Sequence, residues 1–150
     1  MRLNKKLKLG IFALASVLLS VSVKAQLAVE DGFVRGMPPG QPTTAAFFTL
    51  HNDGSEKVTI VEVVSDSAKV AEIHRHLHKN GMMSMQKVER LEIPAKTRFE
   101  FSTGGHHLIL IGLHKALREG DKVTVEFVTD SGRTVAATLP VRSVLNEPHH

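Results

Sequence analysis

The chain from residue 27 onward is a series of short apolar stretches separated by turn residues. The stretches are rich in Val, Ile, Thr and Phe, and Gly, Pro, Asn and Asp stand between them. This pattern predicts β-strands at residues 27–35, 44–52, 58–65, 70–78, 82–88, 97–102, 107–111, 122–129 and 134–141. No stretch has the periodicity of an amphipathic helix. Many short strands without helices predict an all-β, single-domain antiparallel Greek-key β-sandwich.

Histidine and methionine side chains gather on one predicted hairpin of this sandwich. Asn80-Gly81 is the sequence of a tight type I′ turn and joins residues 70–78 to residues 82–88. Side chains alternate between the two faces of a strand, so every second residue shares a face. The alternation groups three histidines on the first strand and two methionines on the second: His74, His76, His78, Met83 and Met85. The hairpin therefore brings imidazoles and thioethers side by side.

This combination of side chains restricts which metal ions the hairpin could bind. A thioether is a soft, uncharged ligand that favours Cu(I), whereas imidazole suits copper, zinc and nickel alike. We therefore expect copper, with Cu(I) preferred and Cu(II) possible. The sequence contains no cysteine, which excludes a zinc ribbon, a blue-copper centre, an iron–sulfur cluster and a cysteine nucleophile.

Each of these residues also has an ordinary structural interpretation. Methionine in a strand is more often core filler than a ligand. A single histidine such as His51 or His114 is most often a surface or hydrogen-bonded residue. Three histidines on one strand face, however, would repel one another if protonated and would gain nothing from a core position. The run His74-x-His76-x-His78 therefore favours metal contact.

The N-terminal segment predicts export. Basic residues precede an apolar run at residues 9–23, and Val23-Lys24-Ala25 resembles a cleavage site, which is the layout of a secretory signal peptide. The alternative is a transmembrane anchor, but the run is shorter than the ~18 to 20 residues that a spanning helix needs. No cysteine follows it to carry a lipid anchor. We expect a signal peptide at residues 1–25, a periplasmic domain at residues 26–142 and a flexible His-containing tail at residues 143–150.

Removal of this segment changes the charge of the protein. The full chain has 19 Lys and Arg residues against 15 Asp and Glu residues, and five of the basic residues lie within residues 1–25. The remaining 14 basic residues nearly balance the 15 acidic ones. We therefore expect no nucleic-acid partner and no stable membrane insertion after cleavage.

The spacing of the candidate ligands matches a known motif. His74 is followed after ten residues by Met85, and after a further 21 residues by His107. This spacing resembles the signature of the periplasmic copper chaperones of the PCu(A)C family. The resemblance continues through residues 34–40, 49–52, 71–74, 93–95, 104–108 and 112–113. It implies a cupredoxin-like β-sandwich in which His74, Met85 and His107 bind copper.

One position departs from the family motif. The last family ligand is a methionine two residues after His107, and this chain has Ile109 there. An isoleucine cannot coordinate metal, so the fourth ligand must come from elsewhere. Met83 shares a strand face with Met85 and His76 shares one with His74, so either could complete the site. His106 points away from His107 in a regular strand and is the weaker candidate.

The family resemblance implies a function in copper handling. A protein of this kind holds copper and passes it to a partner such as a copper oxidase, for example cytochrome oxidase, or one of its assembly factors, and we expect a monomer. The main alternative is a periplasmic buffer for Cu(II) or Zn(II) without a dedicated client, and a structural sandwich without metal is a third. Common catalytic motifs are absent. Glu72 beside His74 could in principle serve acid–base chemistry, but we do not expect an enzyme.

Overall fold

The computed structural model describes residues 27–144, and the expected signal peptide and the terminal pair His149-His150 lie outside this range. The strands are β1 (Leu27–Arg35), β2 (Thr43–Asn52), β3 (Val58–Ser65), β4 (Ala68–Lys79), β5 (Met82–Lys87), β6 (Leu91–Ile93), β7 (Thr97–Glu100), β8 (His106–Leu113), β9 (Lys122–Thr129) and β10 (Thr134–Arg142). Within residues 27–144 no helix has the length and apolar character needed to cross a bilayer. The expectation of an all-β single domain is confirmed.

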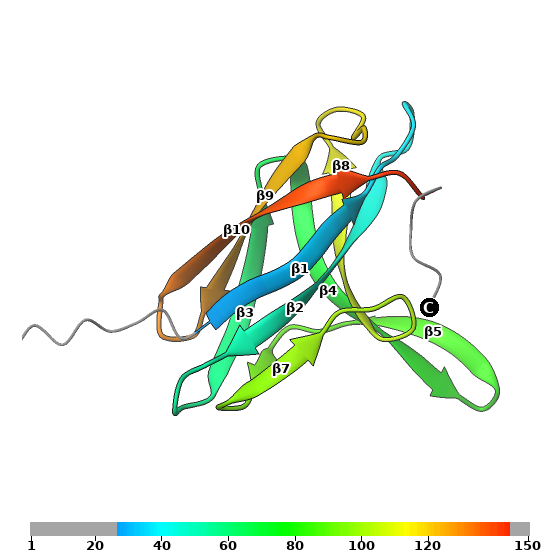
Figure 1. Ribbon diagram of the computed structural model, residues 1–150. Coiled ribbons are helices and arrows are strands. Elements are labelled where there is room, and N and C mark those ends of the chain that lie inside the picture. Colours follow the sequence, from blue (N-terminus) through cyan, green and yellow to red (C-terminus); the bar gives the residue numbers. More distant parts are fainter. Residues whose placement is uncertain (1–26, 145–150) are drawn as a thin grey trace, which may run out of the picture.

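The strands form one sheet that curves round and closes on itself (Figure 1). Its order is β5-β4-β8-β2-β1-β10-β9-β3-β6, and a pairing of Val63 with Ala71 joins β3 back to β4. All pairings between the named strands are antiparallel except that of β1 with β10, which is parallel at Val34 and Val141. The expectation of a purely antiparallel sheet is therefore wrong for the pairing of β1 with β10. The division into two Greek-key, cupredoxin-like layers stays a prediction.

The core lies inside this closed sheet and is built from the inward-facing residues of most strands. Phe48 on β2 lies at its centre, with its ring 4.3 Å from that of Phe101 and 5.4 Å from that of Phe127. Leu108 and Leu110 of β8 are fully buried in the same cluster. The alternation that buries them turns His107 and Ile109 to the other face of β8.

The predicted strands all occur, and the structure adds one more. Strand β4 extends to Lys79 and β8 begins at His106, so both are slightly longer than the apolar pattern indicated. Strand β6, Leu91–Ile93, has no predicted counterpart. Its three residues are too few to show an alternation in the sequence.

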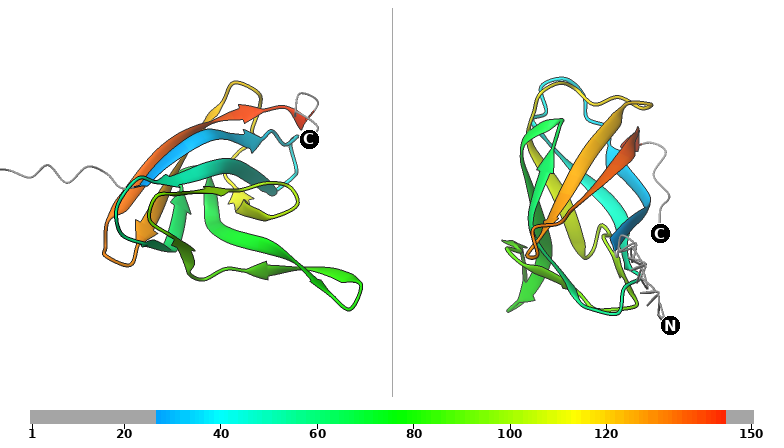
Figure 2. Two further views of the ribbon diagram at one scale, coloured as in Figure 1. Left: turned by 60° about the horizontal axis from the view of Figure 1, so that its bottom comes forward. Right: turned by 90° about the vertical axis from the view of Figure 1, so that its left-hand side faces the viewer.

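Strands β4 and β5 form a ribbon that projects from the body of the molecule (Figure 2). Residues 68–75 of β4 pair with β8, and residues 74–79 pair with β5. The turn has positive φ angles at both Asn80 (53°) and Gly81 (73°). Two successive positive φ angles are the signature of a type I′ turn, so the predicted hairpin is confirmed.

Candidate metal centre

The position of β4 between β5 and β8 brings the predicted ligands onto one face. His74 lies opposite His107 of β8, and His76 lies opposite Met85 of β5. Residues directly opposite each other in neighbouring strands share a face, with Cβ atoms about 5 Å apart. His74, Met85 and His107 therefore belong to a single surface formed by three adjacent strands.

The imidazoles form a compact group on this surface. The ring centroid of His107 is 5.0 Å from that of His76 and 6.5 Å from that of His74. His107 is only 5% exposed, whereas Met85 is 51% exposed. The group therefore has a buried imidazole at its base and a thioether at its open side.

Two nitrogen atoms in this group are buried without a hydrogen-bond partner among residues 27–144. They are Nδ1 of His74 and Nδ1 of His107. A buried polar atom without a partner costs about 1–3 kcal/mol, and most such atoms in folded proteins are paired. Unpaired ring nitrogens on two neighbouring strands are donor atoms that a metal ion could use.

Glu72 fixes the orientation of His74. Its Oε2 atom lies 2.9 Å from Nε2 of His74, and its Oε1 atom lies 3.3 Å from Nζ of Lys87. The hydrogen bond with His74 is the main cause that lowers the pKa of Glu72, and Lys87 lowers it further against the opposing effect of burial. An ionised carboxylate only accepts hydrogen bonds, so Nε2 of His74 carries the proton and Nδ1 presents its lone pair.

The surroundings of the His107 ring favour its neutral form. Burial is the main cause that lowers its pKa, and the neighbouring His76 and His74 lower it further against a hydrogen bond with the Gly105 backbone. A neutral imidazole is the form that binds metal, because protonation would occupy the lone pair.

Several other predicted candidates lie outside this group. Met83 lies opposite His78, two pairs further along the ribbon. His106 is on the other face of β8, with its ring 4.9 Å from that of Phe99. Ile109 lies opposite Glu72, on the same face as His107 but away from Met85.

Carboxylates and histidines alone do not complete a site. Among residues 27–144, no three or more His, Asp or Glu side chains are grouped closely enough to hold a metal ion. The three histidines of this face, His74, His76 and His107, would therefore have to turn toward one another to share an ion. Met85, directly opposite His76, is in the position to add a thioether.

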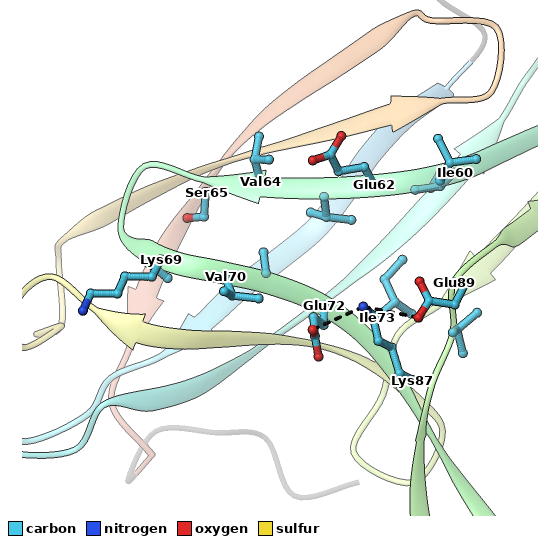
Figure 3. A pocket seen from close by; sticks show the side chains of 15 residues that line it. Ile60, Glu62, Val64, Ser65, Lys69, Val70, Glu72, Ile73, Lys87 and Glu89 are labelled. Atoms are coloured by element: carbon cyan, nitrogen blue, oxygen red, sulfur yellow. Dashed lines mark ion pairs between the residues drawn. The ribbon is translucent and has the colours of Figure 1, made fainter.

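The centre lies beside a cleft and not inside it. A cleft of about 330 Å³ opens between β3 and β4, and its lining includes Glu72, Lys87 and Glu89. Figure 3 shows Lys87 between the two carboxylates, with both ion pairs drawn. None of the residues that line this cleft is a histidine or a methionine. Glu72 is the residue that borders both the cleft and the histidine group.

A matched pair of variants tests the contact between Glu72 and His74. We expect Glu72→Gln to weaken copper binding about tenfold, the lower end of the effect of losing a carboxylate behind a metal-bound histidine. Glu89→Gln is the control, because Glu89 shares the Lys87 contact (3.3 Å) but makes no contact with His74. Copper affinity measured by chelator competition on both variants checks this. Equal losses of copper affinity in the two variants would show that the effect comes from the charge of the carboxylate and not from the contact with His74.

The domain is all-β and carries histidines and methionines on adjacent strands. Comparison with known proteins identifies the family to which it belongs. The chain matches the family model described as "Putative lipoprotein LpqE-like" over residues 27–141. It belongs to this family, and the resemblance to PCu(A)C proteins is confirmed. A relative from Leifsonia xyli subsp. xyli, "Putative lipoprotein Lxx21020", is 33% identical over 104 residues. That match covers 69% of this chain and 63% of the relative's length.

Solved structures share the fold. The copper(I)-bound protein DR1885 from Deinococcus radiodurans has a TM-score of 0.65 and 27% identity, over 82% of this chain and 83% of that one. The copper-bound PCuAC domain from PmoF2 has a TM-score of 0.64 and 15% identity, over 79% of this chain and 94% of that one. The apo PCuAC domain from PmoF1 has a TM-score of 0.65 and 19% identity, over 79% of this chain and 95% of that one.

Proposed function

We propose that this protein is a periplasmic copper chaperone that holds Cu(I) on the face formed by β4, β5 and β8. His74, Met85 and His107 are the ligands in this proposal. The family membership and the structural likeness to copper-binding PCuAC domains support a role in copper binding and delivery. The expected signal peptide supports export to the periplasm.

The single observation that carries the proposal is the pair of unpartnered Nδ1 atoms on His74 and His107. A purely structural histidine at a buried position would use its ring nitrogens in hydrogen bonds. Here Glu72 engages Nε2 of His74 and leaves Nδ1 available. A bound copper ion would satisfy the lone pairs of both residues.

His76 is the fourth ligand in this proposal, and its ring would turn to join those of His74 and His107, because the three are not grouped closely enough as they stand to hold an ion. Ile109 has no donor atom, and a donor is needed beside His107 and Met85. His76 lies directly opposite Met85, and its ring is 5.0 Å from that of His107. Met83, the other candidate from the sequence, lies two pairs further along the ribbon. It is more than half exposed and has His78 as its opposite neighbour.

Cu(I) is the preferred ion because the donor set is neutral and contains sulfur. Imidazole and thioether together suit Cu(I), and Zn(II) would favour a further nitrogen, oxygen or thiolate donor. With Ile109 in place of a second thioether, we expect weaker Cu(I) binding than a complete site would give, and a measurable affinity for Cu(II).

The exposure of Met85 supports transfer to a partner. An ion held partly by an exposed thioether remains open to an incoming ligand, so it can pass by ligand exchange without leaving protein contact. A copper oxidase or one of its assembly factors is the acceptor that we propose. Delivery needs no catalytic group, so the protein acts by binding and transfer.

A titration with three ions tests this proposal. We expect the purified protein to compete for Cu(I) with a chromophoric chelator more strongly than for Cu(II) or Zn(II) in matched assays. X-ray absorption of the copper-loaded protein should show sulfur as well as nitrogen around the ion. Preference for Zn(II) or Cu(II) with a shell of nitrogen and oxygen alone would favour the buffer function. Absence of binding to any of the three would leave a structural role.

A further inference from the structure

The outer ribbon, residues 78–85, carries a second histidine–methionine pair. His78 and Met83 lie directly opposite each other in the register of β4 and β5. Their Cβ atoms are therefore about 5 Å apart on the same face, a separation that the flexible methionine side chain can bridge to meet an imidazole. The pair sits next to the turn at Asn80-Gly81, at the end of the ribbon that projects furthest from the body (Figure 2).

Core packing does not explain the methionines of this ribbon. Met82 is 74% exposed and Met83 is 61% exposed. Every residue from 78 to 87 is exposed, so neither face of the outer ribbon packs on the sandwich. A long apolar side chain in water contributes no burial energy, and an exposed thioether is open to oxidation. The soft sulfur at position 83 therefore has a use other than packing.

The electrostatic surroundings suit a cation held by neutral ligands. The lysine of the outer ribbon, Lys79, lies opposite Met82 and so shares its side of the ribbon, away from His78 and Met83. Lys87 is on the same face as Met83 but is paired with Glu72 and Glu89 at 3.3 Å. The cationic charge nearest the pair is therefore either turned away or neutralised.

We propose that His78 and Met83 form a second, weaker Cu(I) site, where copper enters and leaves the inner group at His76, Met85 and His107. One imidazole and one thioether are donors that Cu(I) accepts at low coordination number. Fewer ligands and full exposure make this site the weaker of the two. Binding at this site depends only on its own pair of residues, whereas its role as the place of entry and exit rests on the proposed function of the inner group.

The two sites are linked along one strand face. Side chains two residues apart on a strand are about 7 Å apart, which separates His78 and Met83 from His76 and Met85. Copper can cross this distance by exchanging one ligand at a time. The ion keeps its Cu(I) state throughout, because each step breaks one Cu–N or Cu–S bond and forms another without electron transfer.

Four proteins test the second site by their Cu(I) stoichiometry: the wild type, Met83→Leu, Met82→Leu and His107→Leu. Cu(I) is added anaerobically in the presence of a weak chromophoric chelator. We expect about two equivalents for the wild type and about one for Met83→Leu. Met82→Leu is the matched control, because it removes the neighbouring thioether from the opposite face, and it should keep both. The Met83 methyl signal in NMR should shift only during addition of the second equivalent.

The outcomes separate this proposal from that of the inner site. His107→Leu should lose the tighter equivalent and keep the weaker one. If the wild type takes a single equivalent that His107→Leu removes, or if Met83→Leu and Met82→Leu behave alike, the second site does not exist. If Met83→Leu removes the tighter equivalent, Met83 belongs to the inner site and the proposal is overturned. If only one equivalent binds and it survives His107→Leu but not Met83→Leu, the outer site stands and the inner one fails.

Discussion

We expect His107→Leu to abolish tight copper binding without destabilising the copper-free protein. His107 is 5% exposed and its Nδ1 has no hydrogen-bond partner among residues 27–144. Leucine has a similar volume and no polar atom to bury. We expect Cu(I) affinity to fall about 100-fold or more, which corresponds to about 2.8 kcal/mol. We expect the free energy of unfolding to stay within about 1 kcal/mol of the wild type, because removal of the unpartnered buried nitrogen offsets loss of the ring's hydrogen bond with the Gly105 backbone.

Chelator competition measures the change in Cu(I) affinity, and denaturant unfolding without metal measures the change in stability. His106→Leu is the control, because this neighbour lies on the other face of β8 against Phe99. It should leave copper affinity within about twofold of the wild type. Loss of stability in His107→Leu, with copper affinity retained, would identify His107 as an ordinary structural histidine.

We expect Ile109→Met to tighten Cu(I) binding. Position 109 shares a strand face with His107 and lies opposite Glu72, so a methionine there would carry its sulfur along the same surface as the histidines. A second thioether raises the preference for Cu(I) over Cu(II). We expect Cu(I) affinity to rise at least about tenfold, or about 1.4 kcal/mol, with little change for Cu(II).

Ile111→Met is the matched control for this variant. Ile111 is on the same face of β8 but two residues further from His107, opposite Val70. A thioether there is too remote to join the ligands, so Cu(I) affinity should stay at the wild-type value. Equal affinities for Cu(I) in Ile109→Met and the wild type would mean that position 109 does not face the metal.

The local features of the fold could be predicted from the sequence alone. Asn80-Gly81 indicated the hairpin, and strand alternation indicated which of its residues share a face. Both features depend on neighbours within a few residues, so the hydrophobic pattern and the turn chemistry suffice to predict them. The parallel pairing of β1 with β10 and the three-residue strand β6 were not predictable in this way.

The site required contacts between distant parts of the chain. Spacing and family resemblance suggested His74, Met85 and His107, but the opposition of His74 and His107 depends on the pairing of β4 with β8. The same register decides that Ile109 faces Glu72, and that His76 lies beside His107 while Met83 does not.

By itself, the sequence determined the strand pattern, the hairpin and the kinds of donor atom, because these follow from residue type and short-range periodicity. Only the tertiary structure decided which donors meet, which nitrogens are left unpartnered and which carboxylate orients them. The physical reason is that register between strands is set by how the whole sheet closes around its core, and a shift of one residue would turn every ligand to the opposite face.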